Sequence, residues 1–383
     1  MRKFIIAPDS FKGTMSAQVV CRILSDAVKK FVPQAEILCI PMSDGGEGMT
    51  EAYAGILGGR IFMETVTGPE GEKLGCPFAI LPDGTAVAEM AGCAGLTLMK
   101  KGLDPLHATT YGVGELMRAL TGRGCKKLLL GIGGSATNDC GIGMAAALGY
   151  GFADEDGAPV APYACNIGRI RQIWTPEKLP ELEITVACDV DNPLCGERGA
   201  TVVFGPQKGL KREQIQPLDE DIRSFAALLK AELGTDVSAY PGAGAAGGLG
   251  AGLMAFCGAK LTPGIDVLLD AAQIDRELVD CELVLTGEGR IDRQSAAGKV
   301  PVGVGRRAKR AGVDCIALCG CIGEGAEAVL SQGVTAYYAP DNVGKSMDEI
   351  KKTCREDLAV AAEKALSHYF RREIPSVYPS PER

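Results

Sequence analysis

The chain has 383 residues, of which 46% are hydrophobic and 23% charged, so it has the material for a large core and does not have the composition of a disordered segment. Its net charge is −8 and its isoelectric point is near 5.1, which argues against a general nucleic-acid binder, because such proteins present a basic face. No stretch reaches the roughly 18 apolar residues of a membrane span, and the apolar run in "MRKFIIAPD" is too short for a secretory signal, so we expect a cytoplasmic protein that contacts neither membrane nor nucleic acid.

The first 60 residues alternate between strands and helices. The apolar run 4–7 predicts a buried strand, and apolar residues at helical spacing predict a helix from Ser16 to Phe31, with Ser16 as its N-cap. The segments "AEILCIP" and "MTEAYAGILGG" predict a second strand and a second helix, which ends in glycines. This alternation is typical of a parallel α/β sheet.

The pattern changes over residues 60–92, where β-prone runs are separated by Gly-Pro, Pro-Glu-Gly and Pro-Asp-Gly. These are turn signals, so we expect hairpins there and no crossover helices. Further on, we predict helices at "TTYGVGELMRAL", "GMAAALGY" and "LDEDIRSFAALLKAEL", and strands at "KKLLLGI", "ELEITVACDV" and "ATVVF".

Strands and helices alternate again from about residue 282. The strands are expected at "CELVLT", "DCIALCG" and "VTAYYA", and the last helix begins with a capping box, Ser346 to Glu349. The simplest architecture is one doubly wound α/β domain made from residues 1–60 and 282–372, with a second α/β domain inserted over 61–281 and a loose tail at 373–383. The expected active site is the cleft between the two domains.

Five of the predicted strands end in polar, glycine-containing loops. The loops read "PDSFKG", "PMSDGGEG", "GGSATNDCGIG", "DVDNPLCGERG" and "GEGRIDRQSAAGK". In an open α/β sheet, ligands bind outside the carboxyl ends of the strands, which is where these loops are expected to lie. Together the loops supply the amides, cations and carboxylates that phosphoryl transfer requires. The residues therefore predict a kinase-like enzyme that acts on a small acidic or polyhydroxy substrate.

The loop "GIGGSATND" at 131–139 is the best candidate for a phosphate site. Its glycines allow backbone amides to approach an anion closely, and the following helix start adds its positive dipole. Ser135, Thr137 and Asn138 add side-chain donors. The alternative is a tight strand-to-helix turn in which Asn138 or Asp139 is the N-cap.

The same loop has the spacing of a dinucleotide fingerprint, with Gly131, Gly133 and Ala136 at G-x-G-x-x-A. The match is weak, because that motif requires a helix to start at once, and Gly141 and Gly143 interrupt the segment.

The segment 294–300, "QSAAGKV", has some likeness to a P-loop. However, Arg293 stands where the first glycine belongs, and Val300 replaces the metal-binding Ser or Thr. Lys299 is still a candidate phosphate ligand through its charge, and the alternative is a solvated lysine at a helix start.

Carboxylates in three of the loops could hold Mg²⁺ or accept a proton. Asp44 lies in "SDGGEG", Asp189 and Asp191 lie in "CDVDNP", and Glu288 lies in "GEGRID". Arg290 in the last loop could grip a carboxylate or a phosphate with two hydrogen bonds. The alternatives are ordinary turns, a helix start that favours acid, and a salt bridge within the loop.

The 15 cysteines are scattered over predicted helices and strands, and we interpret them as reduced thiols that act as small core residues. Cys319 and Cys321 lie close together in "CGC", where two buried or loop thiols are the simpler interpretation and a metal or redox pair is the alternative. With only His107 and His368 present, a zinc site built on histidine is disfavoured.

The sequence contains the blocks "APDSFKGTMSA", "PMSDGGEGMTEA", "ATTYGVGELM", "GIGGSATNDCGIGMAAALG", "ACDVDNPL", "GAAGGLGAGL" and "TGEGRIDRQSAAGKVPVGV". In these blocks the chain resembles the bacterial glycerate kinase family, type I. The blocks cover the chain from about residue 4 to residue 370 in the family's order. The resemblance implies a flavodoxin-like domain with an inserted domain, and ATP-dependent phosphorylation of D-glycerate, most often at the 2-hydroxyl.

On this basis we assign roles to the loop residues as hypotheses. Asp189 is the expected base toward the glycerate hydroxyl. The glycerate carboxylate is expected to bind Lys12 and Arg290, and Ser10 is a further expected substrate contact. The expected contacts of the ATP phosphates are Gly133, Gly134, Ser135, Thr137, Asn138 and Lys299. Mg²⁺ is assigned to Asp44, with Asp191 or Glu288 as second choices.

Three other functions stay open at this point. The same scaffold could phosphorylate the 3-hydroxyl of glycerate. A nicotinamide-dependent oxidoreductase would use residues 131–136, and a non-catalytic sensor would bind an acidic metabolite, although the loop carboxylates count against a receptor for anions. We expect a monomer or a weak homodimer.

Overall fold

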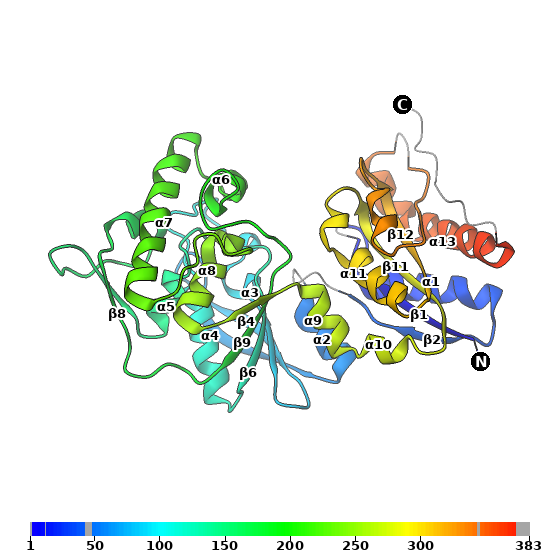
Figure 1. The fold of residues 1–383 in the computed structure, drawn as a ribbon, viewed down its shortest axis with the longest axis horizontal. Coiled ribbons are helices and arrows are strands. Elements are labelled where there is room, and N and C mark those ends of the chain that lie inside the picture. Colours follow the sequence, from blue (N-terminus) through cyan, green and yellow to red (C-terminus); the bar gives the residue numbers. More distant parts are fainter. Residues whose placement is uncertain (1, 12, 43–47, 343–344, 373–383) are drawn as a thin grey trace. The chain divides into compact units, whose positions relative to one another are not determined.

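The structure is a computed structural model, which describes residues 2–11, 13–42, 48–342 and 345–372. Its contacts divide the chain into two compact units (Figure 1). Unit 1 comprises Met1–Asp44 and Ile265–Arg383, and unit 2 comprises Gly45–Gly264. Both units contain helices and strands, so the predicted α/β class is confirmed.

Five parallel strands form the sheet of unit 1, in the order β13-β12-β11-β1-β2. They are β1 (Lys3–Pro8), β2 (Glu36–Cys39), β11 (Cys281–Ile291), β12 (Asp314–Ile322) and β13 (Ala336–Tyr338). Numbered along unit 1 alone, this order is 2-1-3-4-5, which is the flavodoxin-like order. In that topology the ligand site lies at the carboxyl ends of the first and third strands, here β1 and β11.

Helices cover both faces of this sheet. They are α1 (Ala17–Phe31), α9 (Gly264–Ala271), α10 (Ile274–Glu277), α11 (Val300–Arg310), α12 (Ala328–Ser331) and α13 (Met347–Arg371), with a 3₁₀ turn η4 (Ser295–Ala297). Phe4 and Leu285 pack with Leu358 of α13 on one face, and Val302 of α11 packs with Ala317 on the other. Strand β1 is buried from Phe4 to Pro8, which is why its sequence is a continuous apolar run without alternation.

The predicted starts of the two long helices of unit 1 are confirmed. The Ser16 side chain accepts a hydrogen bond from the Val19 N–H at the start of α1. At the start of α13, Ser346 Oγ accepts from the Glu349 N–H and Glu349 Oε2 accepts from the Ser346 N–H. Such caps each stabilise a helix by about 1 kcal/mol, because they satisfy amides that have no partner within the helix.

Unit 2 has a six-stranded mixed sheet in the order β10-β9-β6-β5-β4-β3. Its strands are β3 (Arg60–Thr67), β4 (Lys73–Ile80), β5 (Ala86–Glu89), β6 (Lys127–Gly131), β9 (Glu183–Ala187) and β10 (Lys260–Thr262), and β7 (Gly151–Ala153) pairs separately with β8 (Gln172–Trp174). The pairs β3–β4 and β4–β5 are antiparallel, which confirms the predicted hairpins, whereas β5, β6, β9 and β10 run parallel.

The helices of unit 2 connect and cover these strands. They are α2 (Met49–Leu57), α3 (Ala91–Ala94), α4 (Tyr111–Gly122), α5 (Ile142–Ala147), α6 (Ala200–Phe204), α7 (Arg212–Leu233) and α8 (Ala245–Cys257), with 3₁₀ turns η1 (Leu96–Leu98), η2 (Ala164–Arg169) and η3 (Pro206–Lys208). The strand predicted at "ATVVF" is wrong, because this segment is helix α6. Its Thr201 is fully buried and accepts a hydrogen bond from Asn138, so a long-range contact overrides the β propensity of the segment.

The sequence places the domain boundaries near residues 60 and 281, whereas the compact units divide near residues 44 and 264. Helix α2 therefore lies in unit 2, where it packs against β4 and β5. Glu89 at the end of β5 accepts hydrogen bonds from the Gly48 and Thr50 amides at the start of α2. Burial raises the pKa of Glu89, and these amide donors oppose the rise.

All 15 cysteines are free thiols. Cys319 is fully buried in unit 1, and its Sγ donates to the Tyr338 carbonyl at 3.4 Å, as expected of a core thiol. Among the helices of the described residues, none has the length and apolar character needed for a membrane crossing.

Candidate active site

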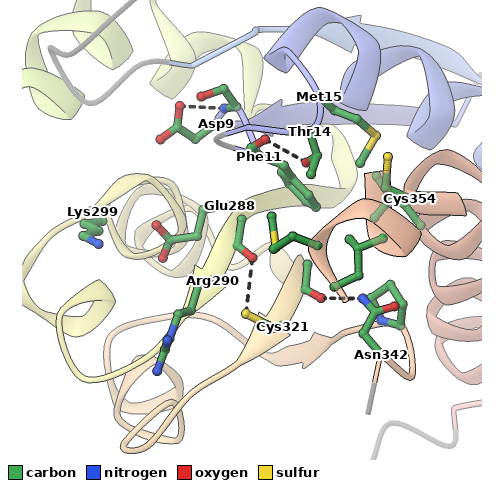
Figure 2. Close-up of a pocket in the computed structure, with 17 residues that line it drawn as sticks. Asp9, Phe11, Thr14, Met15, Glu288, Arg290, Lys299, Cys321, Asn342 and Cys354 are labelled. Carbon is green, nitrogen blue, oxygen red and sulfur yellow. Dashed lines mark hydrogen bonds between the residues drawn. The ribbon is translucent and has the colours of Figure 1, made fainter. Parts of the chain in front are cut away.

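A pocket of about 320 Å³ opens in unit 1 at the carboxyl ends of β1, β11 and β12. Four charged residues lie on one side of it: Asp9, Glu288, Arg290 and Lys299 (Figure 2). Asp9 and Glu288 are only 5% and 6% exposed, so this side carries two buried carboxylates beside two cations. The pocket lies where the flavodoxin-like strand order places a ligand.

The turn after β1 supplies one wall of the pocket. The Asp9 amide donates to the Gly287 carbonyl at 2.8 Å, so β1 stays paired with β11 to its last residue. The Asp9 carboxylate accepts from the Ser10 N–H at 2.6 Å, which fixes its direction. Ser10 also lines the pocket, whereas Lys12 lies outside the described residues.

Strand β11 supplies the opposite charges. The sequence predicts that the strand ends at Thr286, but β11 continues to Ile291 and remains paired with β12. Gly287 allows this close pairing, because a Cβ there would lie 2.0 Å from the Leu318 carbonyl oxygen. Alternate residues of a strand share a face, so Glu288 and Arg290 both reach the pocket.

Arg290 is both a residue of the pocket and a partner in a salt bridge within its own loop. It is among the residues that line the pocket, and its Nε lies 3.1 Å from Asp292 Oδ2, which is the salt bridge named above as the alternative. The Arg290 side chain is 62% exposed, so the salt bridge does not bury it. Lys299 lines the same pocket from the N-cap position of α11.

In unit 2, the loop 131–139 turns its side chains inward. Thr137 and Asn138 are fully buried, and Asn138 Nδ2 donates to Thr201 Oγ1 at 3.0 Å. Gly134 has a φ of +74° and is exposed, and Gly133 is half-buried. The loop surface that a ligand could reach is therefore mainly glycine backbone. Helix α5 begins only at residue 142, so the immediate helix start of a dinucleotide fingerprint is missing.

A buried lysine holds this loop from inside. Lys208 is 3% exposed, and its Nζ donates to Ser135 Oγ at 2.5 Å and to the Thr137 carbonyl at 2.7 Å. Burial lowers the pKa of Lys208 to about 7, and the Asp139 carboxylate opposes that lowering. Sequence reasoning missed this residue, because "GPQKGL" presents it only as a lysine in a turn.

Replacing Lys208 with methionine should change the pH dependence of stability. The pKa of Lys208 is about 7 in the fold and 10.5 in an exposed lysine, so between these values the unfolded chain binds the extra proton. The stability of the unmodified chain should therefore rise with pH across this window and be lost as pH falls towards 7. As pH rises across this window, the unfolding free energy of the unmodified chain should increase by a few kcal/mol relative to that of Lys208→Met, at up to about 1.4 kcal/mol per pH unit. Urea unfolding of both proteins at several pH values in this window measures the difference. If the difference in unfolding free energy does not change with pH, the lowered pKa of Lys208 is contradicted.

The N-cap of α5 is Gly141, not the Asn138 or Asp139 that the sequence offered as an alternative, but the Asp139 carboxylate still binds amides at the starts of two helices. Asp139 is fully buried, and its Oδ2 accepts from the amide and the hydroxyl of Thr110 at 2.9 and 2.8 Å. The amides of Gly141 and Gly143 donate to the same carboxylate at 3.0 and 3.3 Å. One side chain thus satisfies the starts of both α4 and α5. Burial raises the pKa of Asp139, and these donors oppose the rise.

The two aspartates after β9 have different environments. Asp189 is half-buried, and its Oδ1 accepts from the Gly264 amide at 2.9 Å. The Asp191 side chain is 75% exposed and forms an ion pair with Arg198 at 2.9 Å. Only Asp189 therefore has the fixed position that a catalytic base requires.

The residues assigned to Mg²⁺ come from different parts of the chain. Asp44 lies outside the described residues, Asp191 belongs to unit 2 and Glu288 to unit 1. No group of three His, Cys, Asp or Glu side chains suited to a metal occurs among the residues that the structure describes. Mg²⁺ usually needs only one or two carboxylates besides substrate phosphates, and the buried Glu288 of the pocket fits that smaller requirement.

Sequence reasoning also missed Asp9 and Asn342 in the pocket. Each directly follows the end of a strand or the turn after it. The rule that ligands bind at the carboxyl ends of strands, which pointed to Ser10 and Arg290, could therefore have identified both. No comparable signal exists for Lys208, whose partner Ser135 is 73 positions away in the chain.

Comparisons with known proteins agree over nearly the whole chain. The sequence profile of the glycerate kinase family matches residues 4–369. A glycerate kinase of Halalkalibacterium halodurans is 43% identical over 91% of this chain and 93% of its own length. The glycerate 2-kinase of Escherichia coli is 39% identical over 95% of this chain and 98% of its own. A crystal structure of a protein from Salmonella typhimurium LT2, described as a candidate glycerate kinase 2, superposes with a TM-score of 0.84 at 37% identity, covering 97% of this chain and 99% of that one.

Proposed function

The chain belongs to the glycerate kinase family, and from that premise we propose that it phosphorylates D-glycerate at the 2-hydroxyl with ATP. The hydroxyl oxygen forms a bond to the γ-phosphorus, and the bond from that phosphorus to the β,γ-bridging oxygen breaks. ADP leaves, and the hydroxyl proton passes to a carboxylate of the enzyme. The products are 2-phosphoglycerate and ADP.

The observation that carries this proposal is the charged side of the unit 1 pocket. Arg290 and Lys299 there supply positive charge for anionic substrates, beside the buried carboxylates Asp9 and Glu288. We assign Ser10 and the guanidinium of Arg290 to the carboxylate of glycerate, because a guanidinium matches a carboxylate with two hydrogen bonds. Lys299 is assigned to the phosphates of ATP.

Unit 2 contributes two further assignments. The exposed backbone at Gly133 and Gly134 is proposed to contact phosphate, with Lys208 and Ser135 fixing the loop behind it. Asp189 is proposed as the base that takes the hydroxyl proton. Asp9 and Glu288 are the rival bases, because they already lie in the pocket with Arg290.

Mg²⁺ is proposed as the metal that accompanies ATP. Glu288 would hold it together with the substrate phosphates, and Asp44 is the second candidate from the sequence. When bound, such an ion neutralises the charge that develops on the transferred phosphoryl group.

The direct test is ADP release from ATP in the presence of D-glycerate, followed by ³¹P NMR of the product. We expect turnover with D-glycerate well above that with L-glycerate, and a product signal that matches 2-phosphoglycerate. A 3-phosphoglycerate signal would instead establish the 3-kinase alternative. Absence of glycerate-dependent ADP release, together with micromolar binding of NADH, would overturn the kinase assignment in favour of an oxidoreductase.

A further inference from the structure

The side of the unit 1 pocket opposite its charges is apolar. It is lined by Phe11, Met15, Met347, Ile350, Cys354 and Leu358. Figure 2 shows Phe11, Met15 and Cys354 on this side and Glu288, Arg290 and Lys299 on the other. The cavity of about 320 Å³ is within the range of small-molecule sites, so one ligand with unlike ends could fill it.

Glycerate does not match this apolar side. It is a three-carbon acid in which every carbon carries oxygen, and burying such groups against methionine and leucine costs free energy unless each finds a hydrogen bond. An aromatic base has two apolar faces and a polar edge, which is the combination that this side accepts. ATP therefore accounts for a surface that its co-substrate leaves unexplained.

Asn342 adds a specific polar group at the apolar side. Its Nδ2 donates to the Gly320 carbonyl at 3.1 Å, which holds the amide in place (Figure 2). Its Oδ1 is buried and accepts no hydrogen bond from any residue that the structure describes. A buried acceptor without a donor is unfavourable, so a ligand that donates there gains affinity. The exocyclic amine of adenine is such a donor, whereas the corresponding group of hypoxanthine is a carbonyl acceptor.

We propose that the apolar side of this pocket binds the adenine ring of ATP, with Asn342 Oδ1 accepting a hydrogen bond from the 6-amino group. Ile350, Cys354 and Leu358 of α13 and Phe11 contact the ring faces, and Lys299 on the charged side receives the phosphates. The inference rests on the proposed function in so far as ATP is the phosphoryl donor. It adds the location of the base and the residue that selects it.

The first experiment compares ATP with ITP, which differ at position 6 of the purine. For the unmodified chain we expect a KM for ITP about tenfold above that for ATP, because a carbonyl facing Asn342 Oδ1 leaves two acceptors opposed. In Asn342→Ala the KM for ATP should rise towards that for ITP, and the ITP value should change less than twofold. Equal use of ATP and ITP by the unmodified chain, or a preference kept by Asn342→Ala, would overturn the assignment.

The second experiment uses a matched pair of substitutions on α13. Ile350 lines the pocket, whereas Val360 does not and is 67% exposed. Ile350→Glu should weaken ATP binding at least tenfold in calorimetric titration and leave the KM for glycerate within twofold, and Val360→Glu should change neither. Binding of ATP that survives Ile350→Glu would refute the subsite. Calorimetry needs no turnover, so failure of glycerate phosphorylation in the unmodified chain would count against the proposed function without deciding this inference.

Discussion

Replacing Asp189 with asparagine is expected to lower kcat for glycerate phosphorylation by about 10²–10⁴-fold, the usual contribution of a general base. The KM for glycerate should stay within a few-fold, because the amide keeps the shape of the side chain and its Oδ1 can still accept from Gly264. What the variant loses is the ability to take the hydroxyl proton during transfer. Steady-state kinetics with saturating ATP separates the two parameters.

The comparison variants are Asp9→Asn and Glu288→Gln for the rival bases, and Asp236→Asn as the matched control. Asp236 is an aspartate of unit 2 whose carboxylate pairs with Lys230 at the surface, so its replacement should change kcat less than twofold. If Asp189→Asn keeps its turnover, the assignment of Asp189 is wrong. Loss of turnover in Asp9→Asn would then place the base in the unit 1 pocket, whereas loss in Glu288→Gln would also follow from its proposed Mg²⁺ role.

The parts of the fold that the sequence predicts well depend on neighbours in the chain. The apolar run of β1, the turns between β3, β4 and β5, and the capping box at Ser346 are each decided within about ten residues, and all are confirmed. The strand prediction for "ATVVF" is wrong because the conformation of this segment depends on Asn138 and on packing against α7 and α8. The predicted end of β11 is wrong for a similar reason, because β11 stays paired with its partner strand β12 through a glycine-rich stretch.

The candidate site divides in the same way. Ser10, Arg290 and Lys299 come from distant segments, and they line one pocket at the carboxyl ends of the strands, where the rule places ligands. The rule gives a place but no direction for a side chain, so it could not foresee that Thr137 and Asn138 face the interior of unit 2. This rule could not identify Lys208, because the burial of a lysine depends on contacts that form only in the folded chain.

Removing the carboxylate of Asp139 is expected to have the largest effect on stability. In Asp139→Ala the amides of Thr110, Gly141 and Gly143 lose their acceptor inside the fold, and each such loss costs about 1–3 kcal/mol. We therefore expect the free energy of unfolding to fall by more than about 4 kcal/mol, as measured by urea unfolding. Asp139→Asn is the control: one oxygen can still accept at the Oδ2 position, which serves Thr110 and Gly143, so the loss should be less than half as large. An alanine variant within about 1 kcal/mol of the unmodified chain would mean that the starts of α4 and α5 do not depend on this side chain.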